Sequence, residues 1–326
     1  MDGMQAEVRH GPAELDESYA RRIITDFPYP VAKQFTKLRT DECLDPGPLR
    51  LKYILATAEA LGRFVGALVL CECRELLEKQ PAEVPAGLSS QFRRELARPS
   101  WGFWTRVTRE GSKLLRAAGG ASLVRGLDEL WLDPKGGPTE VARALDELLA
   151  VRNGLSHDRI KAMLPGEFRT LCDRTFPLLC VALERAGLLF GFELAFVSAI
   201  AVEKRRRGEP DFVHRFKRIS GVSDDFQGAR EKLHFPLESA AIILKRRDGP
   251  GHLSLEPFYV YEDQAGEAPD IFFLNGVRDN GEIEYAACHR GGRFQSGASA
   301  RGAELAEEIQ HVSEVFDPAG PRGGGP

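Results

Sequence analysis

GFELAFVSAIAV, residues 191–202, is the segment at which the hydrophobic pattern of this chain changes. Before it, apolar residues recur at spacings of three and four, which is the period of an amphipathic helix. After it, short segments rich in β-branched and aromatic residues are separated by clusters of Gly, Pro, Asn and Asp, which favours strands and turns. The sequence therefore predicts an α+β fold, with an N-terminal all-α antiparallel helical bundle followed by a small antiparallel β sheet or barrel.

Four or five helices are expected in the N-terminal half. The longest runs from about Leu49 to Gln80, another begins after the natural cap Ser100, and an amphipathic helix follows Thr139 to about Leu164. The sequence Phe27-Pro28-Tyr29-Pro30 is expected to form an extended strap with two aromatic side chains to bury, because proline disfavours helical backbone. The last helix is expected at 167–189.

The C-terminal half is expected to contain six short strands, at 194–202, 212–219, 240–246, 253–261, 271–274 and 283–287. This division predicts a flexible N-terminal arm at 1–24, a helical bundle at 25–190 and a β domain at 191–302. A terminal helix and a disordered Pro/Gly tail are expected at 303–326.

Composition narrows the classes of function. The chain has 326 residues, 43% of them hydrophobic and 28% charged, with a formal net charge of −4. This profile is typical of a soluble globular protein, and no uninterrupted apolar run of about 18 residues or secretory leader is apparent. The six cysteines form no CxxC pair, so we expect buried thiols in a cytoplasmic protein, without a metal or another cofactor. Because the whole chain is acidic, any contact with nucleic acid requires a local basic patch.

One constellation stands out once common catalytic motifs are excluded. The chain has no GxxxxGK[ST] phosphate loop, no HExxH zinc helix, no GxSxG elbow and no GxGxxG turn. It does contain Arg152-Asn153-Gly154-Leu155-Ser156-His157, which a continuous helix would present with Asn153 and His157 on one face. An imidazole can move a proton near neutral pH, and a guanidinium can bind a phosphate and stabilise developing charge. The alternative is that these residues form only a hydrogen-bonded, exposed helix surface.

This motif resembles the defining mark of the HEPN superfamily, an Arg followed four to six residues later by His, late in a helical bundle. The resemblance covers roughly residues 25–190. It implies a metal-independent endoribonuclease that cleaves single-stranded RNA and acts as a homodimer, with Arg152, Asn153 and His157 as catalytic residues. It further implies a role in bacterial antiviral defence or a toxin system. Other members of the superfamily keep the fold as a scaffold or as a nucleic-acid or nucleotide binder, so a non-catalytic dimerisation module with a β recognition domain is the alternative.

A basic cluster in the β region is the candidate RNA-binding surface. Strand alternation places Arg215 and Lys217 on one face, close in sequence to the run Lys204-Arg205-Arg206-Arg207. Phe216 lies on the other face and is a candidate for stacking on a base if it is exposed. We expect Arg205, Arg206, Arg207, Arg215 and Lys217 to contact RNA phosphates, whereas the alternative is a solvated strand edge protected by its charges. The β domain is also a candidate site for a protein partner or regulator.

Overall fold

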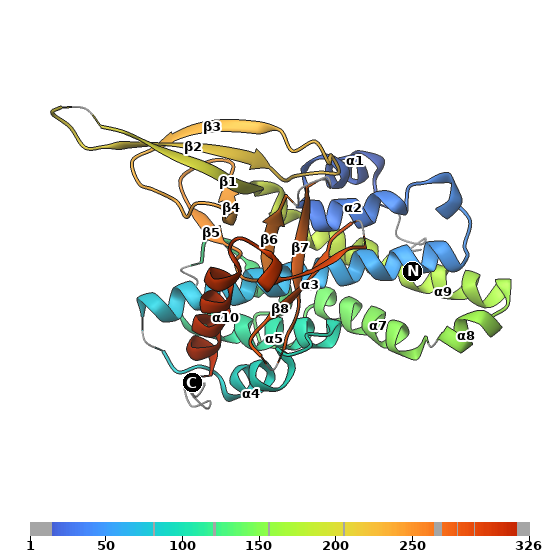
Figure 1. Ribbon diagram of the computed structural model, residues 1–326. Coiled ribbons are helices and arrows are strands. Elements are labelled where there is room, and N and C mark those ends of the chain that lie inside the picture. Colours follow the sequence, from blue (N-terminus) through green and yellow to red (C-terminus); the bar gives the residue numbers. More distant parts are fainter. Residues whose placement is uncertain are drawn as a thin grey trace, which may run out of the picture.

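The computed structural model describes residues 15–80, 82–119, 122–155, 157–204, 206–263, 269–278, 280–289 and 291–317, without the side chains of His157 and Ala298. Helices occupy the N-terminal half, and antiparallel sheets occupy the C-terminal half (Figure 1). The predicted α+β class is therefore confirmed.

The helices of the described residues follow one another from α1 to α9, and α10 comes after the strands. They are α1 (Glu17–Asp26), α2 (Tyr29–Lys37), α3 (Pro48–Lys79), α4 (Ala86–Glu95), α5 (Trp101–Ala117), α6 (Leu127–Trp131), α7 (Glu140–Gly154), α8 (His157–Ala162), α9 (Pro165–Arg185) and α10 (Gly302–Phe316). Short 3-10 helices lie at η1 (Asp41–Cys43), η2 (Ala186–Gly191) and η3 (Ser296–Ala298).

Helix α3 is the long helix predicted from about Leu49 to Gln80, and it runs through the middle of the molecule (Figure 1). It is long and apolar enough to cross a membrane, with a mean hydropathy of 1.7 over its most apolar window. However, 83% of that window is buried inside the protein. A buried central helix of this kind is the expected core of a soluble protein.

Two predicted helix starts are confirmed by their caps. The Ser100 hydroxyl accepts a hydrogen bond from the backbone N–H of Phe103 at 3.2 Å, and the Thr139 hydroxyl accepts one from Ala142 at 3.2 Å. The extended strap expected at residues 27–30 is wrong, because α2 begins at Tyr29 with Pro30 in its first turn. Proline is tolerated there, since first-turn N–H groups have no helical partner. The aromatic side chains of this segment are buried as expected.

The strands form two antiparallel sheets where one sheet or barrel was expected. The first sheet has the order β3-β2-β1-β4-β5 and the second has the order β6-β7-β8-β9. Their bounds are β1 (Phe192–Glu203), β2 (Asp211–Arg218), β3 (Gly228–Leu233), β4 (Ile242–Arg246), β5 (His252–Ser254), β6 (Tyr259–Glu262), β7 (Asp270–Val277), β8 (Ile283–Ala287) and β9 (Arg293–Gln295). The segment predicted as one strand at 253–261 is divided between the two sheets, because Pro257 lies in its middle.

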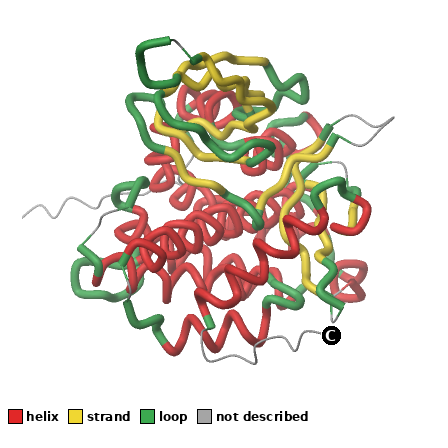
Figure 2. Tube along the Cα trace, turned by 60° about the vertical axis from the view of Figure 1, so that its left-hand side comes forward, coloured by secondary structure: helices red, strands yellow, loops and turns green. Residues whose placement is uncertain are grey.

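The sheets pack against the helices through one large hydrophobic cluster (Figure 2). Phe64 of α3 contacts Tyr259 of β6 with ring centroids 5.6 Å apart, and Trp104 of α5 contacts Phe258 at 5.9 Å. The buried cluster therefore crosses the boundary expected between residues 190 and 191. The division of the chain into separate domains stays a prediction.

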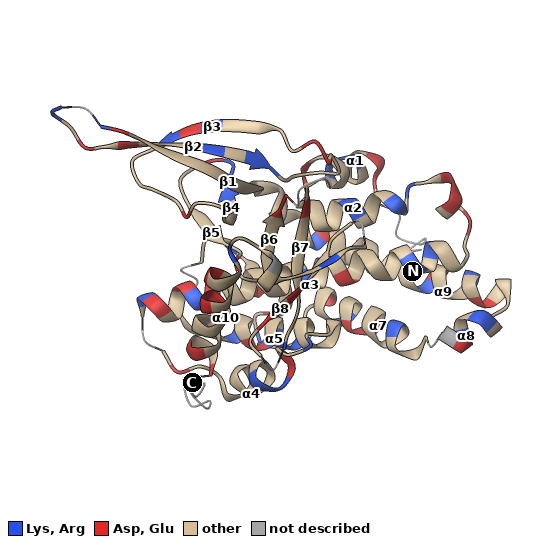
Figure 3. Cartoon of the chain, in the orientation of Figure 1, with Lys and Arg blue, Asp and Glu red and all other residues tan. Residues whose placement is uncertain are grey.

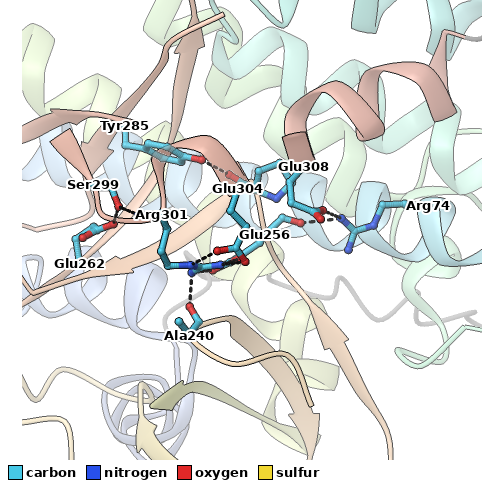
Figure 4. A network of polar contacts seen from close by, with 10 residues as sticks. Arg74, Ala240, Glu256, Glu262, Tyr285, Ser299, Arg301, Glu304 and Glu308 are labelled. Atoms are coloured by element: carbon cyan, nitrogen blue, oxygen red, sulfur yellow. Dashed lines mark hydrogen bonds and ion pairs between the residues drawn. The ribbon is translucent and has the colours of Figure 1, made fainter. Parts of the chain in front are cut away.

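Helices at both ends of the described chain pack against the helical half. Helix α1 begins at Glu17 inside the expected N-terminal arm of residues 1–24, and residues 1–14 lie outside the described part. Helix α10 lies against α3 and α4, where Phe316 contacts Phe92. A buried network of charged side chains, centred on Glu256 and Arg301, joins α10 to the sheets and to α3 (Figure 4). The predicted terminal helix at about 303–316 is therefore present and firmly packed.

All six cysteines are buried and none is part of a disulfide, as the sequence predicted. Burial raises the pKa of the Cys71 thiol to about 12, because the thiolate would lose its hydration inside α3. A thiol that stays protonated at neutral pH is a poor nucleophile and a poor metal ligand. These side chains therefore act as small hydrophobic residues of the core.

Candidate functional site

Arg152 and Asn153 lie in the last turn of α7, on the surface of the helical half. Both residues are exposed, and the Nη1 atom of Arg152 donates a hydrogen bond to the Oδ1 atom of Asn153 at 3.2 Å. Helix α7 is held against the core by the buried side chains of Leu145, Leu148 and Val151 on its opposite face. The packing of α7 therefore directs the predicted pair towards solvent.

The expectation of one continuous helix through the motif is wrong. Helix α7 ends at Gly154, Leu155 has φ −99° and ψ 95°, and a separate helix α8 begins at His157. Asn153 and His157 therefore do not share a face of one helix. Gly154 explains the position of the break, since glycine weakens a helix interior by about 1 kcal/mol relative to alanine.

The junction between α7 and α8 is closed by a side chain from α8. The Nη1 atom of Arg159 donates to the carbonyl oxygen of Gly154 at 3.0 Å, which satisfies one of the last carbonyls of α7. His157 occupies the first turn of α8, but its side chain lies outside the described part of the structure. The structure thus brings the side chains of Arg152 and Asn153 together. That the imidazole of His157 lies beside them stays a prediction.

The guanidinium of Arg152 is available to a ligand. Within the described ranges it has no carboxylate within 4.0 Å, and its one side-chain hydrogen bond is to the neutral Asn153. A guanidinium has five N–H donors, so the bond to Asn153 leaves most of them open to solvent or to an anion. The pair can therefore bind a phosphate oxygen at this position.

Two exposed apolar side chains adjoin this junction. Ile160 of α8 is 37% exposed, and Leu164, which precedes α9, is 67% exposed. Single exposed apolar residues are ordinary on a protein surface, but these two are four positions apart and immediately follow the motif. The end of the bundle that carries Arg152 therefore combines apolar side chains with a cation that has no carboxylate partner among the described residues.

The predicted RNA-binding residues lie on the hairpin formed by β1 and β2. Arg206 and Arg207 are exposed in its turn, Arg215 is exposed on β2, and Arg205 lies outside the described residues. Lys217 instead contacts a side chain of the second sheet, since its Nζ atom donates a hydrogen bond to the Oη atom of Tyr261 at 2.6 Å. This ammonium also lies 4.6 Å from the Tyr261 ring centroid and 3.6 Å from the carboxylate of Asp263. The same contacts raise the pKa of Lys217 against the opposing effect of its burial, which is the largest single influence.

Phe216 is not available for stacking on a base, contrary to that expectation. It is 3% exposed and belongs to a small second hydrophobic cluster on one face of the five-stranded sheet. His214 is fully buried beside it, with the two rings stacked at a centroid distance of 5.8 Å. The predicted alternation along β2 is confirmed, because Arg215 faces away from this cluster.

Sequence reasoning missed Arg230, because the strand that carries it has no hydrophobic signal. Strand β3 has the sequence GAREKL and is largely exposed, so its pattern is typical of a loop. The register pairs Arg230 directly with Arg215 of β2. The available signal was that Ala229, Glu231 and Leu233 alternate towards the second hydrophobic cluster. The charged residues Arg230 and Lys232 between them obscured this pattern.

The motif and the basic hairpin lie at opposite ends of the molecule (Figure 1). A cavity of about 1020 Å³ lies at a third place, beside the first turn of α7, and its lining includes Arg116, Arg143 and Arg185. Arg152 is 12 residues from Glu140 along α7, which corresponds to about 18 Å. Thus the motif lies on an open surface and not in this cavity.

The described residues contain no group of three or more His, Cys, Asp or Glu side chains placed to hold a metal ion. Comparisons with models of protein families, with curated proteins and with solved structures found no match for this chain. Inference about function therefore rests on the chemistry and the positions of the side chains themselves.

Proposed function

We propose that this protein is a metal-independent endoribonuclease of the HEPN type that cleaves single-stranded RNA in the cytosol. The 2′-hydroxyl of one nucleotide attacks the adjacent phosphorus, and the bond to the 5′-oxygen of the next nucleotide breaks. His157 acts as the general base or the general acid in this step. Arg152 stabilises the negative charge that develops on the phosphoryl oxygens, and Asn153 orients the phosphate or the imidazole.

The observation that supports this proposal is the exposed Arg152–Asn153 pair at the junction of α7 and α8. A cation without a carboxylate partner in the described structure can bind a phosphodiester without first breaking an ion pair. The break after Gly154 turns the chain, so His157 enters from the start of a second helix.

The open position of the motif favours a composite site made by two copies of the chain. Arg152 is exposed on the surface of a single copy, and a two-fold axis near α8 would bring two Arg152–His157 sets together. Ile160 and Leu164 supply apolar surface for that contact. The homodimer and a role in bacterial antiviral defence or a toxin system are parts of this proposal.

A second candidate function is a non-catalytic dimerisation module, and one observation favours it. Asn153 and His157 are separated by a helix end, so their relative orientation is less constrained than on one continuous helix. Exposed Ile160 and Leu164 serve an interface equally well without catalysis. In that case the sheets would bind a partner, and Arg152 would contribute only to docking.

The decisive experiment is cleavage of a labelled unpaired RNA by the wild-type protein and by Arg152→Ala and His157→Ala variants, with and without EDTA. The wild type should give products ending in 2′,3′-cyclic phosphate, and a 2′-deoxy substitution at the cleavage site should block the reaction. Loss of His157 should lower the rate by about 10²–10⁴, and loss of Arg152 should lower it by about 10²–10³. EDTA should have no effect.

Arg143→Ala is the matched control, because Arg143 is an exposed arginine near the other end of the same helix. It should retain the wild-type rate. Cleavage that requires a divalent metal, or that persists undiminished in both motif variants, would contradict the ribonuclease assignment. A stable dimer that cleaves none of the RNAs tested would favour the second candidate.

A further inference from the structure

The hairpin of β1 and β2 extends beyond the body of the protein (Figure 1). Its strands are paired from Ala195–Arg218 to Glu203–Asp211, and β3 pairs with β2 from Lys217–Gly228 to Phe212–Leu233, along almost the whole of that strand. Val202, near its end, is 61% exposed, so the body does not cover this part of the hairpin. We name the hairpin together with β3 the basic arm.

Positive charge gathers on the basic arm of an otherwise acidic protein. Lys and Arg residues lie along β2 and at the turn of the hairpin and outnumber the Asp and Glu residues there (Figure 3). Four cations of the arm have no carboxylate within 4.0 Å in the described ranges, and they are Lys204, Arg206, Arg207 and Arg215. All four are exposed. A protein with a net charge of −4 therefore keeps uncompensated cations on one projecting element.

Arg215 and Arg230 occupy directly opposite positions on β2 and β3. Side chains at such positions share a face and lie about 5 Å apart at their Cβ atoms, and like charges placed this way destabilise a sheet. Arg230 reaches Glu203 at 3.5 Å, but both side chains are at least half exposed, so this ion pair is weak. An external anion bound between the two guanidinium groups would relieve the repulsion.

The aromatic side chains of β2 lie on the other face of the arm. Phe212, His214 and Phe216 alternate with Arg215, and the last two are buried. The part of the arm around Arg215 therefore presents guanidinium groups, whereas the aromatic side chains on the same face nearer the body, Phe196 opposite Lys217 and Tyr261, are stacked on each other at a centroid distance of 4.3 Å. A surface with these properties matches a phosphate backbone and not splayed-out bases.

We propose that the Arg215 face of the basic arm binds the phosphate backbone of a base-paired RNA stem. Paired RNA presents regular rows of phosphates and hides its bases, so recognition by charge and shape suits this face. About four residues separate Arg215 from the turn, or roughly 14 Å of strand, which allows Arg215 and Arg207 to contact different phosphates. The choice of RNA rests on the proposed ribonuclease function, and the arm then holds a stem of the same RNA whose unpaired segment is cut at the other end of the protein.

The test measures binding by fluorescence anisotropy, with a 16-base-pair RNA hairpin, a DNA duplex of the same sequence and an unpaired 20-nucleotide RNA. The protein carries Arg152→Ala so that cleavage cannot remove the probe. Arg215→Gln should weaken binding of the RNA hairpin about fivefold at 0.15 M salt, and Arg206→Gln/Arg207→Gln should weaken it further. Each lost phosphate contact should also lower the slope of log K against log salt by about 0.7–0.9.

Arg125→Gln is the matched control, because Arg125 is an exposed arginine outside the arm that also lacks a carboxylate partner in the described structure. It should leave both affinity and slope unchanged. An unchanged affinity in the arm variants would overturn the proposal, as would equal binding of the unpaired RNA or of the DNA duplex. Because the readout is binding, failure here is distinguishable from failure of the ribonuclease assignment, which is measured by cleavage.

Discussion

Glu256 and Arg301 form a buried, two-point ion pair that joins the sheets to the C-terminal helix. The Nη1 and Nη2 atoms of Arg301 donate to the two carboxylate oxygens of Glu256 at 2.8 and 2.7 Å (Figure 4). Glu256 is 4% exposed and precedes β6, whereas Arg301 immediately precedes α10. Burial raises the pKa of Glu256 to about 7, although the hydrogen bonds from Arg301 oppose this shift. This largely buried pair therefore adds to the apolar packing that holds α10 against the protein.

Arg301→Met should destabilise the protein by up to about 3–5 kcal/mol, because it leaves the buried Glu256 carboxyl without its partner, to stay charged or to take up a proton. The double variant Arg301→Met/Glu256→Gln should be more stable than Arg301→Met alone, since it also removes the ionisable group. Urea unfolding followed by circular dichroism measures both effects. Arg278→Ala is the control, because Arg278 is 45% exposed and its ion pairs should contribute at most about 1 kcal/mol. Equal losses in the single and double variants would contradict this account.

The long apolar helices could be predicted from sequence because their pattern repeats over many turns. Apolar spacing along α3 gave its bounds to within a residue, and Ser100 and Thr139 marked starts that the hydrogen bonds confirm. The prediction at residues 27–30 was wrong because proline is unfavourable in the interior of a helix but favourable in its first turn. The division of the strands into two sheets was hidden, because sheet membership depends on contacts between distant residues.

The sequence predicted which residues form the candidate site, but it predicted only part of the geometry of that site. Arg152 and Asn153 are exposed neighbours as expected, but the helix end at Gly154 depends on a local balance that periodicity does not record. Lys217 and Phe216 were assigned to RNA, and both are instead held by long-range contacts, to Tyr261 and to the second hydrophobic cluster. Arg230 could not be found without the register of β3.

Protonation of His214 should destabilise the protein at acid pH. The Nε2 atom of this buried imidazole accepts a hydrogen bond from the N–H of Leu237 at 3.0 Å, and Nδ1 lies 3.1 Å from the carbonyl oxygen of Phe212. Burial lowers the pKa of His214 below 6.5, against a smaller opposite effect of the Phe212 carbonyl and Glu231. The stabilising contribution of the neutral ring is therefore complete above pH 6.5 and is lost as the pH falls through the lower folded-state pKa.

The measurement compares urea unfolding of the wild type and His214→Gln between pH 7.5 and pH 5.0. Glutamine can donate to Phe212 and accept from Leu237 without titrating. The wild type should lose up to about 2 kcal/mol more than the variant over this range. Parallel pH profiles for the two proteins would show that His214 does not carry this dependence.

No side chain should be tolerated at Gly221, because it would both strain the backbone and clash with a neighbouring main-chain atom. Its φ is +70°, and a Cβ atom would lie 2.6 Å from the carbonyl oxygen of Thr25. Gly221→Ala should lower the free energy of unfolding by about 2–4 kcal/mol, through left-handed backbone strain and the clash with main chain. Gly136→Ala is the control, since Gly136 has φ +82° and no atom within 4 Å of an added Cβ, and it should cost only about 1–2 kcal/mol. Equal losses of stability in the two variants would mean that the backbone at Thr25 moves away from the added Cβ atom at no cost in free energy.

The apolar surface beside the motif should determine whether two copies associate. If Ile160 and Leu164 meet their counterparts across a two-fold axis, an aspartate at either position would bury a charge in the interface. Light scattering at concentrations of tens of micromolar should then give a dimer for the wild type and a monomer for Ile160→Asp/Leu164→Asp. Leu44→Asp is the matched control, because Leu44 is 63% exposed and Leu164 is 67% exposed, yet Leu44 lies outside α8 and its flanking turn.

The same variants separate the composite site from a site complete within one chain. A monomeric Ile160→Asp/Leu164→Asp protein should lose RNA cleavage together with association, while Leu44→Asp retains both. Mixing an excess of Arg152→Ala chains with wild-type chains should then lower the activity per wild-type chain, because most wild-type chains would be in dimers with only one intact Arg152. Full activity in a monomeric variant would contradict the shared site while leaving Arg152 and His157 as candidate catalytic residues of a single chain.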